Sequence, residues 1–196
     1  MKRIILLGTI LFISVLSTAC VNNLAIQELN NKAQEYMNKG DVDSAICRLE
    51  TSLDLDNDIF ETHYNLGIAY LNAKKYDKSV SSLKKAVELN PDFVDTYYSL
   101  AVAIDEFNFM EIEKIKNPQN NIEGEAPVIT VDTTVVEPVT KKLSDEEKAV
   151  ITQKVNESIE AYNNYLTKKP DAEEKSLIEN RIAALNAELE FDSLVK

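Results

Sequence analysis

Apolar residues recur at helical spacing through residues 60–93 of the chain. Positions three and four residues apart share one face of an α-helix, so each run of such positions predicts a helix with one buried face. The first run comprises Leu66, Ala69 and Tyr70, and the second comprises Val80, Leu83 and Val87. Gly67 and Ala86 provide small residues where the two helices must approach closely, and Pro91 ends the second helix because proline cannot continue it. The pattern predicts a pair of packed helices.

The end of this helix pair has an earlier counterpart in the chain. Residues 86–93 are AVELNPDF, and residues 52–59, thirty-four positions earlier, are SLDLDNDI, with the same order of residue types. A single helix pair cannot bury its own apolar face, whereas identical pairs at constant spacing stack into one core. We therefore predict a 34-residue repeat. Its preceding copy has matching positions at Leu29, Ala33, Tyr36, Ala45, Leu49 and Ser52, with Asn57 in place of the terminal proline.

The turn within this first copy is predicted at residues 38–43, NKGDVD. Gly40 can adopt the positive φ that ends a helix, and Asp41 or Asp43 can cap the next one. Lys32 occupies a place that is apolar in the second copy, and such a polar outer face suits a terminal repeat.

The pattern in residues 60–93 resembles the tetratricopeptide repeat (TPR). The resemblance rests on a set of large, small and turn residues at that family's spacing: His63, Leu66, Gly67, Tyr70, Ser79, Leu83, Ala86 and Pro91. His63 departs from it, because a tryptophan or another large apolar residue is usual there. The resemblance implies an all-α, TPR-type helical-hairpin solenoid.

A third copy is predicted to be split. Its first helix has Tyr97, Leu100, Ala101 and Ile104 at the matching places, but no second helix follows directly. Instead YLTKKPDA at 165–172 echoes the repeated turn, so we predict an insertion at 117–143 between the two helices. Its prolines, threonines and valines favour disorder, and a strand that pairs with a partner's sheet edge is the alternative.

The segment after the insertion is predicted to be helical throughout. Ser144 and Glu147 fit a capping box, which marks a helix start. The long helix that follows has apolar residues at helical spacing: Ile151, Val155, Ile159, Tyr162 and Leu166. Asp171 begins a last helix that resembles the capping helix of TPR arrays. An antiparallel helical hairpin that belongs to no repeat is the alternative for 144–190.

The first twenty residues have the features of a secretory signal peptide. Lys2 and Arg3 precede an apolar stretch, residues 4–16, and the small residues of LSTAC follow. LSTAC resembles a lipobox, the processing site of bacterial lipoproteins, although Ser17 stands where that family prefers leucine. The resemblance implies cleavage before Cys20 and a lipid on its sulfur. The alternative is an uncleaved anchor over residues 4–21, at the lower limit for spanning a bilayer.

These observations divide the chain into a signal peptide (1–19), the lipidated Cys20 with a short tether (20–23), TPR helices (24–116), the insertion (117–143) and the final helices (144–196). The body is expected in the bacterial cell envelope, on the periplasmic or extracellular face. The chain has a net charge of −12, and cleavage makes it −14 by removing Lys2 and Arg3. A body this acidic argues against nucleic-acid binding, which needs a cationic surface.

Residues for catalysis or metal binding are not evident in the sequence. His63 occupies a core-facing position, and Cys47 is expected to be a small buried residue within a helix. Asp54, Asp56 and Asp58 imitate the start of an EF-hand loop, but residue 59 is Ile where that loop needs glycine. The pair Asp105 and Glu106 is expected on a solvated face. We therefore expect no enzyme, no cofactor and no metal.

The family's groove lies along the first helix of each repeat, and a TPR array curves into a concave binding surface. By the resemblance, the groove positions are Asn30, Asn31, Gln34 and Asn38 in the first repeat, Tyr64, Asn65, Ile68 and Asn72 in the second, and Tyr98, Ser99, Val102 and Glu106 in the third. None is basic, which disfavours the family's carboxylate-binding subtype.

Amides can hold an extended peptide backbone, and Tyr64 and Tyr98 provide rigid contact area. Alternatively, these tyrosines pack between repeats and the amides are merely solvated. The predicted function is that of a membrane-anchored, protein-binding adaptor or assembly scaffold whose partner is another envelope protein. The alternative is a structural protein whose groove is filled by self-association through the helix at 145–168.

Overall fold

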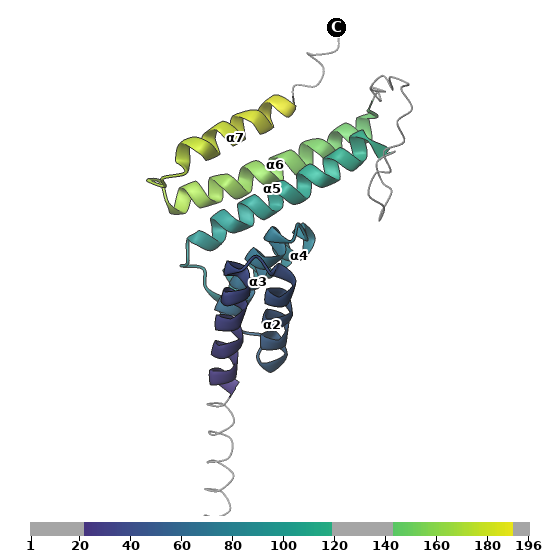
Figure 1. Cartoon of the computed structure of the whole chain (residues 1–196). Coiled ribbons are helices and arrows are strands. Elements are labelled where there is room, and N and C mark those ends of the chain that lie inside the picture. The colour runs from purple at the N-terminus through teal and green to yellow at the C-terminus, as the bar shows by residue number, and fades with distance from the viewer. Residues whose placement is uncertain (1–21, 119–142, 190–196) are drawn as a thin grey trace, which may run out of the picture. The chain divides into compact units, whose positions relative to one another are not determined.

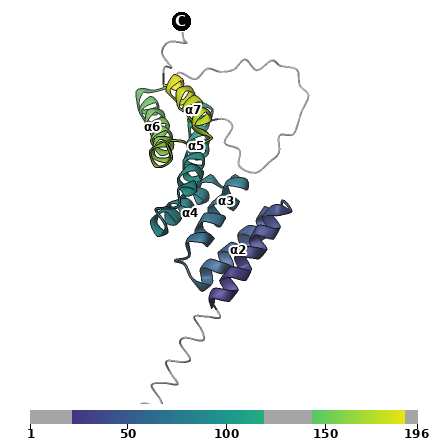
Figure 2. The same ribbon diagram turned by 90° about the vertical axis from the view of Figure 1, so that its left-hand side faces the viewer.

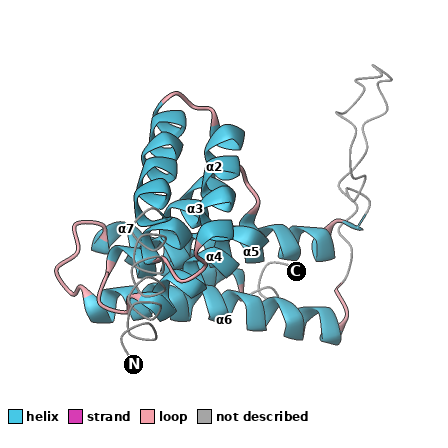
Figure 3. Ribbon diagram, turned by 90° about the horizontal axis from the view of Figure 1, so that it is seen from below, coloured by secondary structure: helices cyan, strands magenta, loops and turns pink. Residues whose placement is uncertain are grey.

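The computed structural model describes residues 22–118 and 143–189, and every regular element in these two ranges is a helix (Figure 1). The first helix covers residues 22–38. It is followed by α2 (Val42–Leu55), α3 (Phe60–Asn72), α4 (Tyr76–Leu89), α5 (Asp95–Lys116), α6 (Asp145–Lys168) and α7 (Lys175–Glu188). Short loops join them in the part of the chain that is described, as Figure 3 shows. The prediction of an all-α fold is confirmed.

The chain divides into two compact units, Met1–Leu100 and Ala101–Lys196, which are described separately below. Helix 22–38, α2, α3 and α4 belong to the first unit, α6 and α7 belong to the second, and α5 begins in the first and ends in the second. Residues 22 and 23, which we had assigned to the tether, are already helical.

In the first unit, helices pack in consecutive antiparallel pairs, and Figure 2 shows helix 22–38 beside α2. Their shared core consists of small and aliphatic residues with one tyrosine: Ala33, Ala45, Ile46, Leu49, Leu66, Ala69 and Tyr70. α4 approaches α3 so closely that a Cβ atom on Gly67 would lie 2.5 Å from Leu83 Cγ. The small residue predicted at this helix contact is therefore required sterically.

The turns of the two repeats use the same backbone geometry with different residues. Gly40 has φ of 76°. Asp41 caps α2, since its carboxylate accepts a hydrogen bond of 3.2 Å from the Ser44 amide. Thirty-four residues after Gly40, Lys74 adopts φ of 57° although it carries a side chain. The repeat thus preserves a left-handed turn even where the sequence lacks glycine.

His63 and Cys47 respectively confirm and correct the sequence-based expectations for the first unit. His63 is buried, as predicted, and its Nε2 lies 2.8 Å from the carbonyl oxygen of Asn57. Cys47 was expected to be buried, but it is exposed on α2. The helix face that packs in the core includes Ala45, Ile46 and Leu49, and residue 47 points away from it.

In the second unit, α5 and α6 run antiparallel and α7 packs against them (Figure 1). α6 begins with the predicted capping box, in which Ser144 and Glu147 bond to each other's backbone amides at 2.9 and 3.2 Å. α7 begins at Lys175 rather than at Asp171, because turns around the buried Ala172 occupy the intervening residues.

The expectation that Asp105 lies on a solvated face is wrong. Asp105 is buried and accepts two hydrogen bonds from the Arg181 guanidinium, at 2.7 Å from Nε and 2.9 Å from Nη2. It also accepts one from the Tyr162 hydroxyl at 3.0 Å. Its neighbour Glu106 is exposed, as expected. The buried carboxylate joins α5, α6 and α7.

Candidate functional site

Two adjoining hollows lie along helix 22–38 and α3, the first helices of the first two repeats. The larger has a volume of about 510 Å³ and is lined by Asn23, Ile26, Gln27, Asn30, Asn31, Gln34, Ile59, Glu61 and Asn65. The smaller has a volume of about 250 Å³ and is lined by Ala33, Gln34, Met37, Leu49, Tyr64, Asn65 and Ile68. Because Gln34 and Asn65 line both, we treat the two hollows as one groove.

Six of the twelve predicted groove residues line this surface: Asn30, Asn31, Gln34, Tyr64, Asn65 and Ile68. Asn38 does not line it directly, but its Oδ1 accepts a hydrogen bond of 3.1 Å from Gln34 Nε2. In the first two repeats, the face that the repeat spacing indicates is therefore the face that carries the two hollows.

The remaining predicted positions line neither hollow. Asn72 is exposed at the last residue of α3. Ser99 is buried, and its hydroxyl donates to the Asp95 carbonyl at 3.1 Å within α5. Tyr98 is half-buried in the same helix, and Val102 and Glu106 belong to the second unit.

Asn30 is fixed at the floor of the groove by buried hydroxyls. Its Nδ2 donates to Thr62 Oγ1 at 2.9 Å, to Ser52 Oγ at 3.2 Å and to the Ile26 carbonyl at 3.0 Å. The Ser52 and Thr62 hydroxyls lie 3.1 Å apart and are fully buried. This network joins helix 22–38, α2 and α3.

Asn65 extends the same network into the groove, since its Nδ2 donates to Asn30 Oδ1 at 3.0 Å. The two amides are therefore held in one orientation before any ligand arrives, which lowers the entropic cost of binding. The predicted alternative, amides that are merely solvated, does not apply to this pair.

Other amides of the groove are free to bind a ligand. Asn31 and Gln27 are exposed, and neither side chain has a hydrogen-bond partner among the described residues. Each offers one carbonyl oxygen and two N–H donors. The groove therefore combines rigid and unoccupied polar groups.

Tyr64 belongs to an aromatic cluster that sequence analysis did not identify. Its ring centroid lies 5.3 Å from that of Phe93 and 6.0 Å from that of Phe60, and the two phenylalanines lie 5.2 Å apart. Phe93 is 37% exposed. Tyr64 thus packs against two phenylalanines of its own repeat, whereas the predicted alternative placed it between repeats, and it also lines the smaller hollow.

Eight lining residues were missed: Asn23, Ile26, Gln27, Ile59 and Glu61 in the larger hollow, and Ala33, Met37 and Leu49 in the smaller one. The signal for three of them was available, because Asn23, Ile26 and Gln27 continue the face of Asn30 and Asn31 by steps of three and four. Glu61 lies in the first turn of α3, and the repeat pattern in the sequence assigns no role to this position.

Glu61 is the only described lining residue of either hollow that carries a charge at neutral pH. A carboxylate near a helix N-terminus is favoured by the helix dipole. No lysine, arginine or histidine lines the groove in the part of the chain that the structure describes. Its charge is therefore negative.

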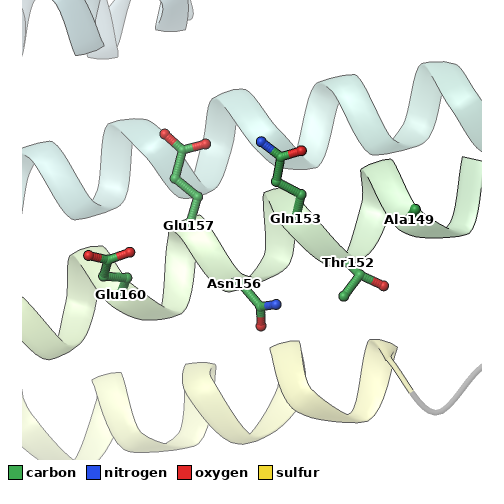
Figure 4. A pocket seen from close by; sticks show the side chains of 6 residues that line it. All are labelled: Ala149, Thr152, Gln153, Asn156, Glu157 and Glu160. Carbon is green, nitrogen blue, oxygen red and sulfur yellow. The ribbon is translucent and has the colours of Figure 1, made fainter.

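A further hollow of about 750 Å³ lies along α6 in the second unit (Figure 4). Gln153 and Glu157 point to one side of α6, and Thr152 and Asn156 point to the other. With Ala149 and Glu160 they line a hollow on a single helix, with polar residues at five of its six positions. One helix provides less enclosure than a groove between two helices.

The titratable groups with shifted pKa values indicate structural roles. Burial and a hydrogen bond of 2.6 Å to Glu50 raise the pKa of Tyr70 far above its ordinary value. Burial and a hydrogen bond to Glu174 likewise raise the pKa of Tyr165. Both hydroxyls stay protonated as donors. No group of three or more potential metal ligands occurs within residues 22–118 and 143–189.

The signal peptide, Cys20 and residues 119–142 of the predicted insertion lie outside the described residues. The resemblance to a lipoprotein therefore stays a prediction. Within the described ranges, none of the helices combines the length and the apolar character needed to cross a bilayer.

Residues 60–93 match the sequence model of the tetratricopeptide repeat. The comparison with curated protein sequences gave no match. The solved structures that resemble the chain include the first TPR domain of the human RPAP3 protein, with a TM-score of 0.56 at 19% identity, covering 84% of this chain and 94% of that one.

Two further structures were determined with peptides. The first TPR of Spaghetti (RPAP3), bound to the HSP90 peptide SRMEEVD, has a TM-score of 0.55 at 18% identity and covers 85% of this chain and 94% of that one. The second TPR domain of human RPAP3, in complex with the HSP70 peptide SGPTIEEVD, has a TM-score of 0.53 at 11% identity and covers 84% and 98%. The chain thus contains a tetratricopeptide repeat at residues 60–93 and has an all-α, TPR-type fold.

Proposed function

We propose that the chain is a protein-binding adaptor that holds an extended polypeptide segment in the groove between helix 22–38 and α3. The observation that carries this proposal is the combination of fixed and free amides in one groove. Asn30 and Asn65 are oriented by buried hydrogen bonds, while Asn31 and Gln27 have no partner among the described residues. Extended peptides expose backbone N–H and C=O groups that such amides can bind.

The peptide complexes of the structural neighbours support a polypeptide ligand in general. Both peptides, SRMEEVD and SGPTIEEVD, end in EEVD and are acidic. Binding such carboxylates calls for basic side chains, and the groove of this chain has none among its described lining residues. We therefore propose a partner of different charge from those peptides.

We further propose that Cys20 carries a lipid that anchors the adaptor in the bacterial cell envelope. This part rests on the sequence: the apolar stretch 4–16, the small residues before Cys20 and the acidic body. Acyl chains supply about 0.8 kcal/mol per buried CH₂, which an acidic surface near anionic lipids would need. Cells fed an alkyne-labelled fatty acid should label the wild-type chain and not Cys20→Ala. Equal labelling of both would exclude lipidation at this residue.

Site-specific photocrosslinking tests the groove in cells. A photoreactive phenylalanine at residue 27 or 31 should crosslink to a second polypeptide upon illumination. The matched control is residue 48, where Arg48 is exposed on α2 and lines neither hollow. Adducts from residue 48 alone would contradict binding in the groove.

Self-association through residues 145–168 is the second candidate. The α6 surface around Thr152 and Gln153 is exposed, as this candidate requires. This surface carries Glu157 and Glu160 and no basic residue among its described lining residues, so a contact between two copies would bury carboxylates without cations. Sedimentation of the full chain in detergent distinguishes the two functions, because only self-association predicts a stable dimer.

A further inference from the structure

We infer that the groove selects a segment with a lysine or arginine side chain, which binds against Glu61. This inference rests on the proposed function and specifies its partner. The carboxylate of Glu61 is exposed, lies at the edge of a 510 Å³ hollow and has no ion-pair partner among the described residues. It is the charged group that a ligand in this hollow would meet.

Three other acidic residues on the same unit have lysine partners. Asp43 pairs with Lys75 at 3.4 Å, Asp58 pairs with Lys85 at 3.4 Å, and Glu35 pairs with Lys32 at 3.2 Å. Carboxylates on a helical surface commonly form such pairs with nearby lysines. Glu61 differs because its neighbours in the hollow are amides and isoleucines.

The groups around Glu61 suit a cation chemically. An ammonium group has three N–H donors and a guanidinium group has five, and neither has an acceptor. The hollow offers the two oxygens of Glu61 and the amide oxygens of Gln27 and Asn31, whose side chains are unpaired in the described structure. A cationic side chain can therefore place several donors at once.

The same groups disfavour an acidic segment. A carboxylate in this hollow would meet Glu61 and would find no basic side chain among the lining residues described here. The net charge of −12 also attracts cationic segments at long range and repels anionic ones. The contact with Glu61 and the negative charge of the chain thus both favour a positively charged partner segment.

A peptide array tests this inference. The full chain, dissolved in a non-ionic detergent and carrying a fluorescent tag, is applied to several thousand random dodecapeptides and to overlapping peptides of its own sequence. Bound random peptides should be enriched in lysine and arginine relative to the array. Fluorescence anisotropy then measures the strongest basic binders in solution.

Glu61→Gln should weaken those binders about five-fold, the effect of one partly exposed ion pair. The matched control Glu28→Gln removes an equal charge from helix 22–38 at an exposed position outside both hollows, and it should leave binding unchanged. Raising the salt concentration should weaken the wild-type complex more than the Glu61→Gln complex. Glu61→Lys should shift the enrichment toward acidic peptides.

The outcomes separate this inference from the proposed function. Binding without enrichment in basic residues, or equal weakening by Glu61→Gln and Glu28→Gln, overturns the role of Glu61 and leaves the groove as a peptide site. Binding confined to peptides of the chain's own sequence also overturns the inference, because the occupant would then be the chain itself. If no peptide binds the wild-type chain, the proposed function fails as well.

Discussion

The two units stabilise their helices by different polar contacts. In the first unit the network consists of neutral groups: the Ser52 and Thr62 hydroxyls and the Asn30 amide join three helices. In the second unit a charge is buried, since the Asp105 carboxylate accepts hydrogen bonds from Arg181 and Tyr162. Both networks connect helices, and among the described residues the first one also lines the groove through Asn30 and Asn65.

The apolar content of the helices explains this difference. The helices of the first unit repeat the same apolar positions, so each pair finds a matching neighbour. α7 has only two buried residues, Ile178 and Leu185, with Arg181 between them on the same face. Two apolar contacts fix a 14-residue helix poorly, and the bidentate ion pair supplies the missing specificity. Helices within the repeats pack through their repeated apolar positions, whereas the last helix, α7, is held by a specific ion pair.

Among the substitutions that test this difference between the units, Arg181→Ala should reduce stability most. It leaves the Asp105 carboxylate buried without its cation, and breaking a buried ion pair costs about 3 kcal/mol. Hydrogen exchange followed by mass spectrometry should show faster exchange in α5, α6 and α7, with α3 and α4 nearly unchanged.

The matched control for Arg181→Ala is Lys114→Ala, which breaks the surface pair of Lys114 with Glu111 on α5. Exposed pairs contribute about 0–1 kcal/mol, so this variant should exchange like the wild type. Equal effects of the two substitutions would mean that the buried charge does not hold α7.

Asn30→Ala tests the network of the first unit. It removes the partner of two buried hydroxyls and of Asn65, and an unsatisfied buried group costs about 1–3 kcal/mol. The free energy of unfolding, measured with urea, should fall by about 2 kcal/mol.

Asn31→Ala is the neighbouring control. Asn31 is exposed and has no partner among the described residues, so its loss should change stability by less than about 0.5 kcal/mol. It should nevertheless weaken peptide binding. A stability loss as large as that of Asn30→Ala would contradict the distinction between fixed and free amides.

The sequence predicted the parts that repeat. The 34-residue spacing located the close approach at Gly67, the turn at Gly40 and the groove face that holds Asn30 and Asn65. These features follow from local periodicity, since each recurs in a second copy of the pattern.

The parts that occur once could not be predicted in the same way. Asp105 and Arg181 are 76 residues apart and meet only because α7 folds back against α5. Helical spacing from Ala101 places Asp105 on the core face, but nothing in the local sequence identifies the cation that it meets there. Likewise, Glu61 becomes notable only when the structure places it in a hollow without a cation among its described lining residues.

The buried tyrosines allow both units to be compared by pH. The pKa of Tyr70 is raised, mainly by burial and by its bond to Glu50, and that of Tyr165 is raised by burial and by Glu174. A raised pKa means that the folded chain keeps the proton longer than the unfolded chain. The resulting stability is complete below the ordinary tyrosine pKa of about 10 and is lost as the pH rises above it.

Tyr70→Phe and Tyr165→Phe should each reduce the loss of folding stability above pH 10. One tyrosine contributes at most about 1.4 kcal/mol per pH unit above pH 10, and phenylalanine contributes none. Urea unfolding at pH 9 and pH 11 measures the difference for the wild type and both variants. If the three curves fall in parallel, these hydroxyls do not control alkaline stability.

The smallest expected effect is a gain of stability at Lys74. Its φ of 57° lies in the left-handed region, where a side chain costs roughly 1 kcal/mol, and the residue is exposed. Lys74→Gly removes that strain but makes the unfolded chain more flexible, so we expect a net gain of about 0.5 kcal/mol. The reciprocal control is Gly40→Ala, where an added Cβ meets nothing within 4 Å and only backbone strain acts. It should cost about 1 kcal/mol. If both substitutions destabilised the chain equally, the two turns would not share the geometry that the repeat imposes on them.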